Sequence, residues 1–450
     1  MIPLRLGDIR SASLVHGDPE LEITGLVADS RLARPGSLFA CMRGSRVDGH
    51  DFVADAARRG AVAVLCAPGR APTAGPLEAL ESADPLATLA EVGGLVRARA
   101  QARVIGIAGS AGKTTLKDVL QALFEPHLAT VASRASHNNE LGVPLTLALV
   151  EPGTAACVCE LGTGAPGELA ALCATVRPDI GVLTAIGPEH LEFFGNVQGV
   201  AAEEAALLAS LPPGAPVVVP FGEPLLEPYR RSDLDEWSFG LDTQADVRPL
   251  AWRPQAAGTA AALAVRGHRV DFTTSLRLPH HRLTLAAAAA VYAALGLPLD
   301  RIGEGAAAIA LSPCRGQEQP LRHGARLIND AYNANPLSMR AALEALAARR
   351  NGGRTIAVLG PMAELGSEAR RWHVLAGRQA GELGVDVVVA IGPGARGYLD
   401  GATGRTACLW FPDRDRAIGP LRSLLQPGDV VLLKGSRTAG LERLAEALTR

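Results

Sequence analysis

Several features that mark particular classes of protein are absent from this sequence. No apolar stretch reaches the roughly 18 residues needed to cross a bilayer, and the first residues lack the apolar core of a signal peptide. No basic or acidic run stands out, and the formal net charge is only −2. The charge pattern therefore gives no indication of a nucleic-acid partner or a membrane surface. We expect a cytoplasmic protein that neither inserts into membranes nor binds nucleic acid.

Cysteine is scarce and lacks the usual spacing of zinc ligands. The seven cysteines are scattered along the chain, and the absence of a C-x-x-C pair argues against a structural zinc site. Cys157 and Cys159 lie in an apolar, strand-like run, in which residues two apart share one face. Buried free thiols in a reducing compartment are the simplest interpretation.

Aromatic residues are also rare, at 4% of the 450 residues, whereas alanine is abundant. This composition is typical of a helix-rich α/β enzyme. At roughly 150 residues per domain, the length predicts two to four domains.

The clearest motif is a glycine turn between an apolar strand and a helix. Residues 104–108 are rich in β-branched side chains, and residues 116–124 carry apolar side chains at helical spacing. The turn between them consists of Gly109, Ser110, Ala111, Gly112, Lys113, Thr114 and Thr115. Such a turn directs backbone N–H groups and a helix N-terminus at a phosphate. Lys113 would reach the β- and γ-phosphates of a nucleotide, the Thr114 hydroxyl would bind Mg²⁺, and Thr115 would support the turn.

This motif is a shortened form of the general phosphate loop. Ile107 occupies the position where the longer form has its first glycine, so the match is to G-x-x-G-K-T-T. We prefer the phosphate loop to an ordinary glycine-rich turn because glycine, lysine and two hydroxyls occur in the right order between a strand and a helix.

Two further strands carry candidate metal ligands at their ends. Glu160 ends the strand at 155–161, and His190 follows the strand at 180–186. In a parallel sheet, ligands gather beyond the carboxyl ends of the strands, which would bring these side chains to the same rim as Thr114. Oxygen ligands with one imidazole suit Mg²⁺ bound to ATP. Alone, either residue would more simply be a solvated carboxylate or a turn-filling histidine.

The next helix, predicted over 198–210, carries Glu203 and Glu204. Neighbouring helical residues diverge by about 100°, so at most one of the two faces the site. Residues 222–280 predict a β-rich stretch that ends at His280 and His281. We expect no metal there, because neighbouring residues on a strand point to opposite faces.

The N-terminal segment contains polar turns that would suit a diphosphate or a nucleotide. The same residues would equally build ordinary polar turns, and the chemistry alone leaves both interpretations open. The candidate residues are Ser30, Arg31, Arg43, Arg46, Asp48 and His50.

The last third of the chain predicts a second βαβ domain. Strands at 326–329, 355–359, 387–391 and 430–433 alternate with helices at about 337–349, 368–383 and 438–449. An amide-rich loop at 329–336 follows the first strand, and a cationic turn at 434–437 follows the last. A phosphate loop faced by this amide-rich loop predicts ATP in a cleft that closes and excludes water.

With these motifs in view, the chain resembles the Mur ligase family over nearly its full length. The segments NNELGVP, DAYNANP and KGSR point within the family to ligases that add D-Ala-D-Ala to a UDP-linked muramyl tripeptide. The resembling segments are 29–31, 48–50, 109–115, 138–144, 160–162, 166–168, 190–192, 329–336, 338–339, 362–366 and 434–437.

The resemblance implies three domains and one reaction. We expect a small α/β UDP-binding domain at 1–82, a central parallel-sheet ATPase domain with the phosphate loop at 83–312, and a Rossmann-like domain at 313–450. The family transfers the γ-phosphoryl group of ATP to the peptide carboxylate, and the D-Ala-D-Ala amine then attacks the acyl phosphate. The expected product is a peptidoglycan precursor, with ADP and phosphate released. The enzyme would use Mg²⁺ and act as a monomer.

The resemblance also assigns roles to residues. Lys113 would stabilise the transferring oxygens, and Asn138 and Asn139 would line the γ-phosphate and acyl site. Thr114 and Glu160 would hold one Mg²⁺, and His190 with Glu160 a second. The residues that would close over the nucleotide are Arg315, Tyr332, Asn335 and Arg437. The UDP-linked substrate would contact the N-terminal residues named above.

The sequence departs from the family pattern around the nucleotide. Glu204 stands where relatives commonly carry a carbamoylated lysine that serves a Mg²⁺, and we expect its carboxylate to replace that group. The adenine motif H-N-x-x-N reads His281 to Leu285 without either asparagine, and Pro361 and Cys314 replace an aspartate and a glycine. A divergent ligase for another carboxylate and amine, or a weakly active binding partner, is therefore the alternative.

Overall fold

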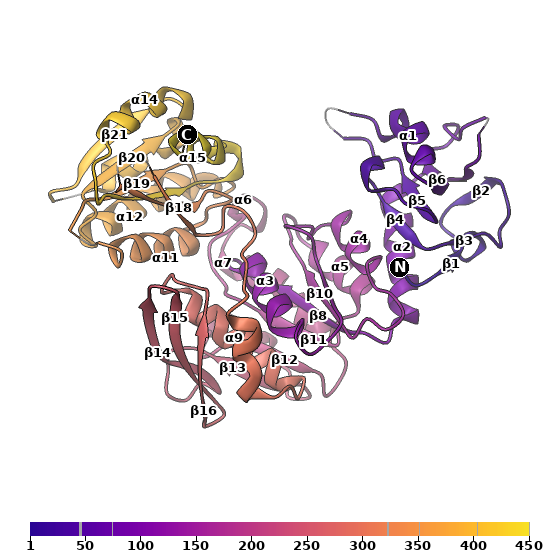
Figure 1. Cartoon of the computed structure of the whole chain (residues 1–450), viewed down its shortest axis with the longest axis horizontal. Helices are drawn as coiled ribbons and strands as arrows, with labels where there is room; N and C mark the ends of the chain where they lie inside the picture. Colours follow the sequence, from indigo (N-terminus) through magenta and orange to yellow (C-terminus); the bar gives the residue numbers. More distant parts are fainter. Residues whose placement is uncertain (45–46, 74, 322–323, 351, 403, 450) are drawn as a thin grey trace.

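The computed structural model describes residues 1–44, 47–73, 75–321, 324–350, 352–402 and 404–449. Arg46, one of the predicted N-terminal donors, lies outside these residues. Within them the chain forms three α/β lobes that follow one another in sequence, with the first and last on either side of the central one (Figure 1). None of the helices in the described part of the chain combines the length and the apolar character that crossing a membrane requires. The predicted α/β class and three-domain architecture are confirmed.

The N-terminal lobe contains a five-stranded sheet in the order β2-β7-β6-β5-β4. Strands β4 to β7 are parallel to their neighbours, and β2 is antiparallel to β7. The elements are β2 (Ser13–His16), β4 (Gly25–Val27), β5 (Ser37–Ala40), α1 (Val53–Arg58), β6 (Ala61–Cys66) and β7 (Glu78–Glu81). Strands β1 (Leu4–Arg5) and β3 (Glu22–Ile23), which precede and follow β2 in the sequence, form a separate two-stranded antiparallel sheet.

The central lobe is built on a nine-stranded sheet in the order β16-β15-β14-β13-β12-β11-β8-β10-β9. In this spatial order, all neighbouring strands between β14 and β9, including β8, are parallel. The pairs β14–β15 and β15–β16 are antiparallel. The strands are β8 (Arg103–Ala108), β9 (Thr130–Ala132), β10 (Ala156–Glu160), β11 (Ile180–Leu183), β12 (Pro216–Pro220), β13 (Asp235–Phe239), β14 (Val247–Gln255), β15 (Gly258–Val265) and β16 (His268–Thr274).

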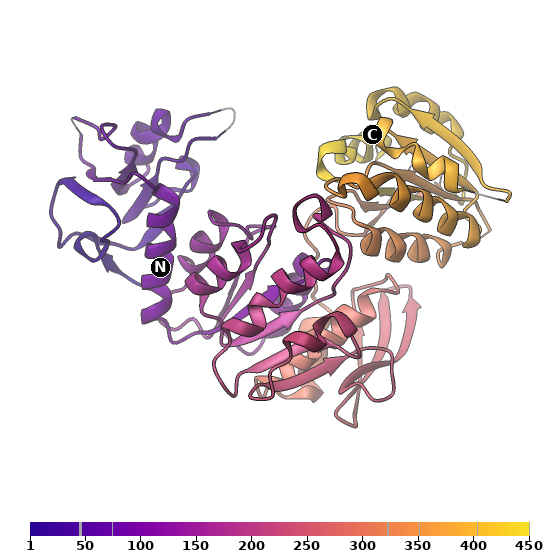
Figure 2. The ribbon, with the colours of Figure 1, turned by 180° about the vertical axis from the view of Figure 1, so that it is seen from behind.

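Helices cover both faces of this central sheet, because its parallel strands are apolar on both sides. One cluster of buried side chains joins the sheet to α2 (Pro85–Arg99), α4 (Gly142–Leu147), α5 (Glu168–Val176) and α8 (Ala206–Ser210). The other joins it to α3 (Lys113–Phe124) and α9 (His281–Ala294). Figure 2 shows the helices of the first cluster from behind.

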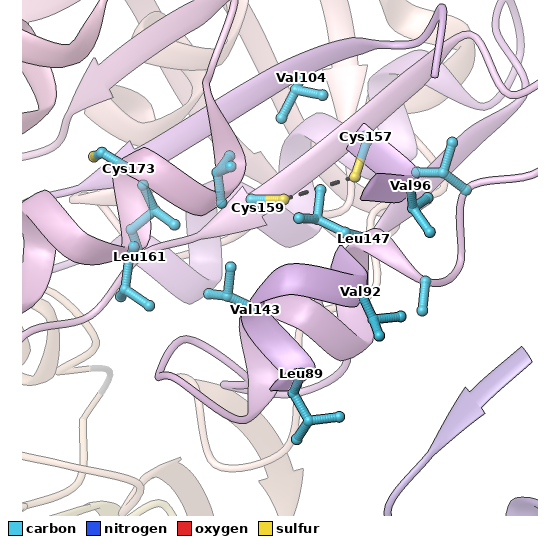
Figure 3. Close-up of a cluster of buried hydrophobic side chains, with 14 of the residues drawn as sticks. Leu89, Val92, Val96, Val104, Val143, Leu147, Cys157, Cys159, Leu161 and Cys173 are labelled. Atoms are coloured by element: carbon cyan, nitrogen blue, oxygen red, sulfur yellow. Dashed lines mark hydrogen bonds between the residues drawn. The ribbon is translucent and has the colours of Figure 1, made fainter. Parts of the chain in front are cut away.

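The first cluster explains the cysteine pair. Along β10, Cys157 and Cys159 point into the cluster with α2 and α4, and their Sγ atoms lie 3.7 Å apart (Figure 3). Ala156 and Val158 point to the opposite face, against α3. The prediction that the two thiols share one face is confirmed, and both are buried and free.

The C-terminal lobe has a six-stranded sheet in the order β17-β18-β22-β19-β20-β21. All strands are parallel except β17, which runs antiparallel to β18. The elements are β17 (Gln317–Pro320), β18 (Arg326–Asp330), α11 (Pro336–Ala347), β19 (Thr355–Leu359), α12 (Ala369–Glu382), β20 (Val387–Ile391), β21 (Ala407–Phe411), α14 (Arg414–Leu424), β22 (Val430–Lys434) and α15 (Leu441–Thr449).

The sheets suggest where the domains divide. Their strands come from residues 13–81, 103–274 and 317–434. Ser312, between the second and third sheets, is held to α3 by Asp118, which accepts hydrogen bonds from its N–H at 2.6 Å and its hydroxyl at 3.0 Å. We propose domains at 1–82, 83–312 and 313–450.

Candidate active site

The glycine turn connects β8, which lies between β10 and β11 in the central sheet, to α3. Gly109 and Gly112 have φ angles of 118° and 89°, in the region that favours glycine. A Cβ atom on Gly109 would also lie 2.4 Å from Thr184 Oγ1. Gly112 begins α3 without a side-chain cap. The first N–H groups of α3 therefore have no capping side chain and suit an anionic ligand.

The turn forms one wall of a cavity of about 840 Å³ that residues of the central and C-terminal lobes line together. Most residues predicted for the nucleotide and metal reach it. They are Ser110, Ala111, Gly112, Lys113, Thr114, Thr115, Asn138, Asn139, Glu160, His190, Arg315, Tyr332, Asn335 and Arg437. Gly109 and Glu204 are not part of this lining, and Glu204 Oε2 accepts a hydrogen bond of 2.6 Å from the Gly109 N–H.

Glu160 lies at the end of β10, beside β8, and is 2% exposed. Its Oε1 accepts a hydrogen bond of 2.9 Å from Asn138 Nδ2. Because the neighbouring strands are parallel, β10 brings Glu160 to the same edge as the glycine turn. Asn138 therefore orients the carboxylate toward the cavity that both residues line.

His190 follows β11 and precedes the short helix α6 (Leu191–Phe194). Its φ of 48° is matched by a φ of 61° at Glu364 of the C-terminal lobe, and such angles in non-glycine residues mark local strain. The Glu364 carboxylate lies 2.5 Å from His190 Nδ1, and the Glu364 carbonyl accepts the Glu192 N–H at 3.1 Å. Burial lowers the pKa of His190, although Glu364 opposes the shift. The imidazole thus lies where the central and C-terminal lobes meet.

A second buried carboxyl, Glu189, was not among the predicted site residues. It lines the cavity, its Oε1 lies 4.0 Å from Lys113 Nζ, and it is close enough to Glu204 to share a hydrogen bond. Burial raises the pKa of Glu189 to about 8, with a contribution from Glu204, while Lys113 opposes the shift. The signal available in the sequence was a carboxylate directly before His190, in the same loop.

Lys113 lies among these acids. Its ammonium donates to the Gly109 carbonyl. Burial alone would lower the pKa of Lys113, but the carboxylates of Glu189, Glu204 and Glu160 raise it overall. The lysine is therefore a fixed positive charge at the phosphate loop.

The acids of the site fit a hard divalent cation. When all three are ionised, one oxygen of each lacks a donor among the described residues, namely Glu160 Oε2, Glu189 Oε1 and Glu204 Oε1. Buried carboxylate oxygens without partners are costly. Mg²⁺ would satisfy such oxygens together with the nearby Thr114 hydroxyl.

The C-terminal lobe contacts the phosphate loop directly. Arg315 Nη2 donates to Thr114 Oγ1 at 2.8 Å, and its guanidinium lies 4.0 Å from the centre of the Tyr332 ring. Asn335 Nδ2 donates to the Ser110 carbonyl at 2.7 Å, while its Oδ1 caps α11. Tyr332 also exchanges a hydrogen bond with Ser136 of the central lobe. Arg437, 5.7 Å from the Tyr332 ring centre, completes this group.

Replacing Arg315 with alanine is expected to weaken MgATP binding roughly 10- to 100-fold, because a hydrogen bond to a charged group contributes about 1.5–3 kcal/mol. Isothermal titration calorimetry measures this change. Arg326→Ala removes an exposed guanidinium that pairs with Glu318 and should leave the affinity unchanged. Equal affinities for Arg315→Ala and the parent protein would contradict a role in holding the nucleotide.

The N-terminal candidates do not line this cavity. Ser30 is buried and donates to Asp55 at 2.8 Å, and Arg31 is exposed and forms a two-pronged contact with Asp29. Arg43 is exposed and bridges to Asp48 in a short antiparallel contact. The imidazole of His50 is turned inward, with Nδ1 at Asp48 and Nε2 at the Ala67 N–H. The two arginines are therefore the accessible donors of this group.

Comparison with known proteins gives a consistent result along the chain. Three family models match, described as Mur ligase family, catalytic domain, at residues 22–86, Mur ligase middle domain at 107–293, and Mur ligase, glutamate ligase domain, at 315–437.

Individual relatives match over nearly their whole length. The UDP-N-acetylmuramoyl-tripeptide–D-alanyl-D-alanine ligase of Escherichia coli K12 is 31% identical, covering 99% of this chain and 97% of the relative. The same-named ligase of Mycobacterium tuberculosis H37Rv is 36% identical, over 95% of this chain and 92% of the relative. Among solved structures, MurF of Acinetobacter baumannii is 29% identical, with a TM-score of 0.84 over 96% of this chain and 95% of that one. MurF of Thermotoga maritima in complex with ADP is 27% identical, with a TM-score of 0.81 over 94% and 97%.

Proposed function

Since the chain belongs to the Mur ligase family, we infer that it is the ATP-dependent ligase that joins D-Ala-D-Ala to UDP-N-acetylmuramoyl-tripeptide. The full-length similarity to ligases of that name supports this activity in peptidoglycan precursor synthesis. The structural observation that carries it is the meeting of two lobes at the phosphate loop, where Asn335 and Arg315 contact Ser110 and Thr114.

The reaction needs neutralisation of charge more than acid–base catalysis. The γ-phosphoryl group passes from ATP to the terminal carboxylate of the UDP-linked peptide, and ADP is released. The amine of D-Ala-D-Ala then attacks the acyl carbon, the amide forms, and phosphate leaves. We propose that the Lys113 ammonium stabilises the phosphoryl oxygens, while the first turn of α3 binds the phosphates.

The asparagines and acids around Lys113 would position the reacting groups. Asn138, which already orients Glu160, and its neighbour Asn139 would line the acyl site. Mg²⁺, when bound, neutralises phosphate oxygens, and Thr114, Glu160, His190 and Glu204 would hold it. Glu189, close to both Lys113 and Glu204, joins this set.

The closing residues would exclude water from the acyl phosphate, which water would otherwise hydrolyse. Arg315, Tyr332, Asn335 and Arg437 would cover the nucleotide from the C-terminal lobe. We further propose that the UDP portion binds the N-terminal lobe through Arg31 and Arg43, with Ser30, Asp48 and His50 supporting the polar turns beneath them. We also propose that the enzyme is a cytoplasmic monomer.

Phosphate release should require all three substrates. With ATP, UDP-N-acetylmuramoyl-tripeptide and D-Ala-D-Ala, we expect sustained release of one phosphate for each amide formed, measured by a coupled phosphate assay and mass spectrometry of the product. Omitting the dipeptide, or replacing it with L-Ala-L-Ala, should abolish amide formation. Turnover only with another carboxylate and amine would indicate a divergent ligase, and no turnover with any pair would indicate a binding role.

A further inference from the structure

The N-terminal lobe brings two thiols and an imidazole together at the carboxyl edge of its sheet. Strands β5 and β6 are parallel neighbours, and the Cys41 N–H donates to the Leu65 carbonyl at 2.9 Å. Cys41 and Cys66 therefore lie side by side where the two strands end, 2% and 0% exposed. One ligand atom from each of Cys41, His50 and Cys66 lies within 4.8 Å of the others.

Gly49 allows the histidine to reach the thiols. A Cβ atom on Gly49 would lie 2.7 Å from Met42 N and 2.9 Å from Cys41 Cα, so only glycine permits this close approach of the two chain segments. The short helix that begins at Gly49 then carries His50 to the ends of β5 and β6. The contact is thus built into the backbone and does not depend on a flexible side chain.

The imidazole is oriented in the way that metal-binding histidines usually are. Asp48 Oδ1 lies 2.6 Å from His50 Nδ1 and also accepts the His50 N–H at 3.0 Å. A proton on Nδ1 makes Nε2 an acceptor, and Nε2 accepts a hydrogen bond of 3.1 Å from the N–H of Ala67, directly after Cys66. A carboxylate behind a histidine in this manner fixes its tautomer and raises its basicity toward a metal.

We propose that Cys41, Cys66 and His50 bind one zinc ion, with water as the fourth ligand. The two thiols lose their protons to solvent and bind as thiolates, and His50 binds through Nε2 in place of the Ala67 N–H. Zinc bond lengths place tetrahedral sulfur ligands about 3.8 Å apart, so small side-chain shifts close the site. Two thiolates and Zn²⁺ are together neutral, which suits a buried position, and soft sulfur ligands favour zinc over Mg²⁺.

This proposal revises the expectation drawn from cysteine spacing. Cys41 and Cys66 are 25 residues apart, and parallel strand pairing, rather than a C-x-x-C turn, makes them neighbours. The zinc would join the ends of β5 and β6 to the antiparallel bridge between Arg43 and Asp48, next to the arginines that we propose bind the UDP portion. The metal site itself does not depend on the ligase activity.

Cobalt substitution tests the site without any measurement of turnover. The full-length protein is stripped with a chelator under reducing conditions, saturated with Mg²⁺ and titrated with Co²⁺. We expect one tightly bound Co²⁺ per chain with a thiolate-to-cobalt charge-transfer band in the near ultraviolet, which oxygen ligands at the magnesium site do not produce. With zinc, native mass spectrometry should show one added Zn²⁺ and the loss of two protons.

Variants then locate the ligands. Cys66→Ser and His50→Gln should each lower the affinity at least about 100-fold, and Asp48→Asn, which keeps all three ligands, about 10- to 100-fold. Cys408→Ser, at an exposed thiol, and Cys157→Ala, in the other buried thiol pair, are the matched controls and should retain the band.

Three results would overturn the proposal. They are a wild-type protein that gives no charge-transfer band, a band that persists in folded His50→Gln, and a Cys41–Cys66 disulfide in protein purified under reducing conditions. The wild-type spectrum decides the question even where a cysteine variant fails to fold.

Discussion

Replacing Lys113 with alanine is expected to lower the rate of ATP-dependent amide formation about 10³-fold, which is the effect of removing one preorganised group that stabilises transition-state charge. In the structure the Lys113 ammonium lies among Glu160, Glu189 and Glu204, and their carboxylates raise its pKa despite the opposing effect of burial. It therefore remains charged throughout the neutral range. The other lysine among the described residues that line the cavity is Lys434, whose Nζ pairs with Asp330 at 2.5 Å. Initial rates of phosphate release and product formation measure the change.

A second variant and folding measurements distinguish a loss of catalysis from a loss of folding. Lys113→Arg keeps the positive charge and should lose less activity than Lys113→Ala, because a guanidinium can still contact phosphate oxygens. Circular dichroism and thermal unfolding establish that both variants fold. An alanine variant that forms the amide at the parent rate would remove the basis for assigning the nucleotide to this loop.

The sequence predicted best those elements in which the apolar pattern along the chain agrees with burial in the folded protein. The strands at 355–359 and 387–391 have the bounds that were predicted, and those predicted at 326–329 and 430–433 each end one residue later. The strands at 355–359 and 387–391 are apolar and buried on both faces. Local propensity and tertiary packing act together at these positions.

Edge strands gave weaker signals. β17 has the sequence Gln-Glu-Gln-Pro, and the first three residues of β21 are exposed. Both lie at the ends of the C-terminal sheet. β17 carries polar and charged side chains, which discourage further pairing at an edge, and it lacks the apolar run by which the inner strands were recognised. β21 is apolar, Ala-Cys-Leu-Trp-Phe, although its first three residues are exposed.

The predicted site depended on topology, and its gaps have local causes. Glu160 and His190 were identified because Glu160 ends one strand next to β8 and His190 follows the other. Glu189 was missed because it precedes His190 in the same loop and no separate strand end marks it. His280 and His281 were placed on a strand, which was wrong, because His280 precedes α9 and His281 begins it. Their rings pack edge to face, 4.6 Å apart. The predicted helix at 198–210 is divided into α7 (Val197–Glu204) and α8.

The division of Glu203 and Glu204 between two environments leads to the second large prediction. Glu204 accepts the Gly109 N–H behind the phosphate loop. Glu203 instead binds the start of α5, accepting from Thr163 Oγ1 at 3.0 Å, Gly167 N at 2.7 Å and Leu169 N at 2.8 Å. The rotation of about 100° between neighbouring helical residues thus directs the Glu204 carboxylate to the phosphate loop and the Glu203 carboxylate to the start of α5.

Glu204→Gln is expected to lower turnover about 10²-fold and to raise the Mg²⁺ concentration needed for half-maximal activity. The amide oxygen still accepts the Gly109 N–H, so the loop keeps its shape, but the negative charge that attracts the cation is lost. Burial raises the pKa of Glu204, which means that its charge is unfavourable in the folded protein. We therefore expect the variant to be as stable as the parent or more stable by about 1 kcal/mol.

Glu203→Gln is the matched control, and we expect it to change the stability of the fold but not the Mg²⁺ dependence of activity. It removes a charged acceptor of three hydrogen bonds and should destabilise the fold by about 1–3 kcal/mol, while the Mg²⁺ dependence remains that of the parent. Metal titrations of activity, metal-binding calorimetry and thermal unfolding of the two variants measure both effects. If Glu204→Gln leaves the Mg²⁺ requirement and turnover intact, Glu204 serves only to support the phosphate loop, and the cation must be held by Glu160, His190 and Thr114 without it.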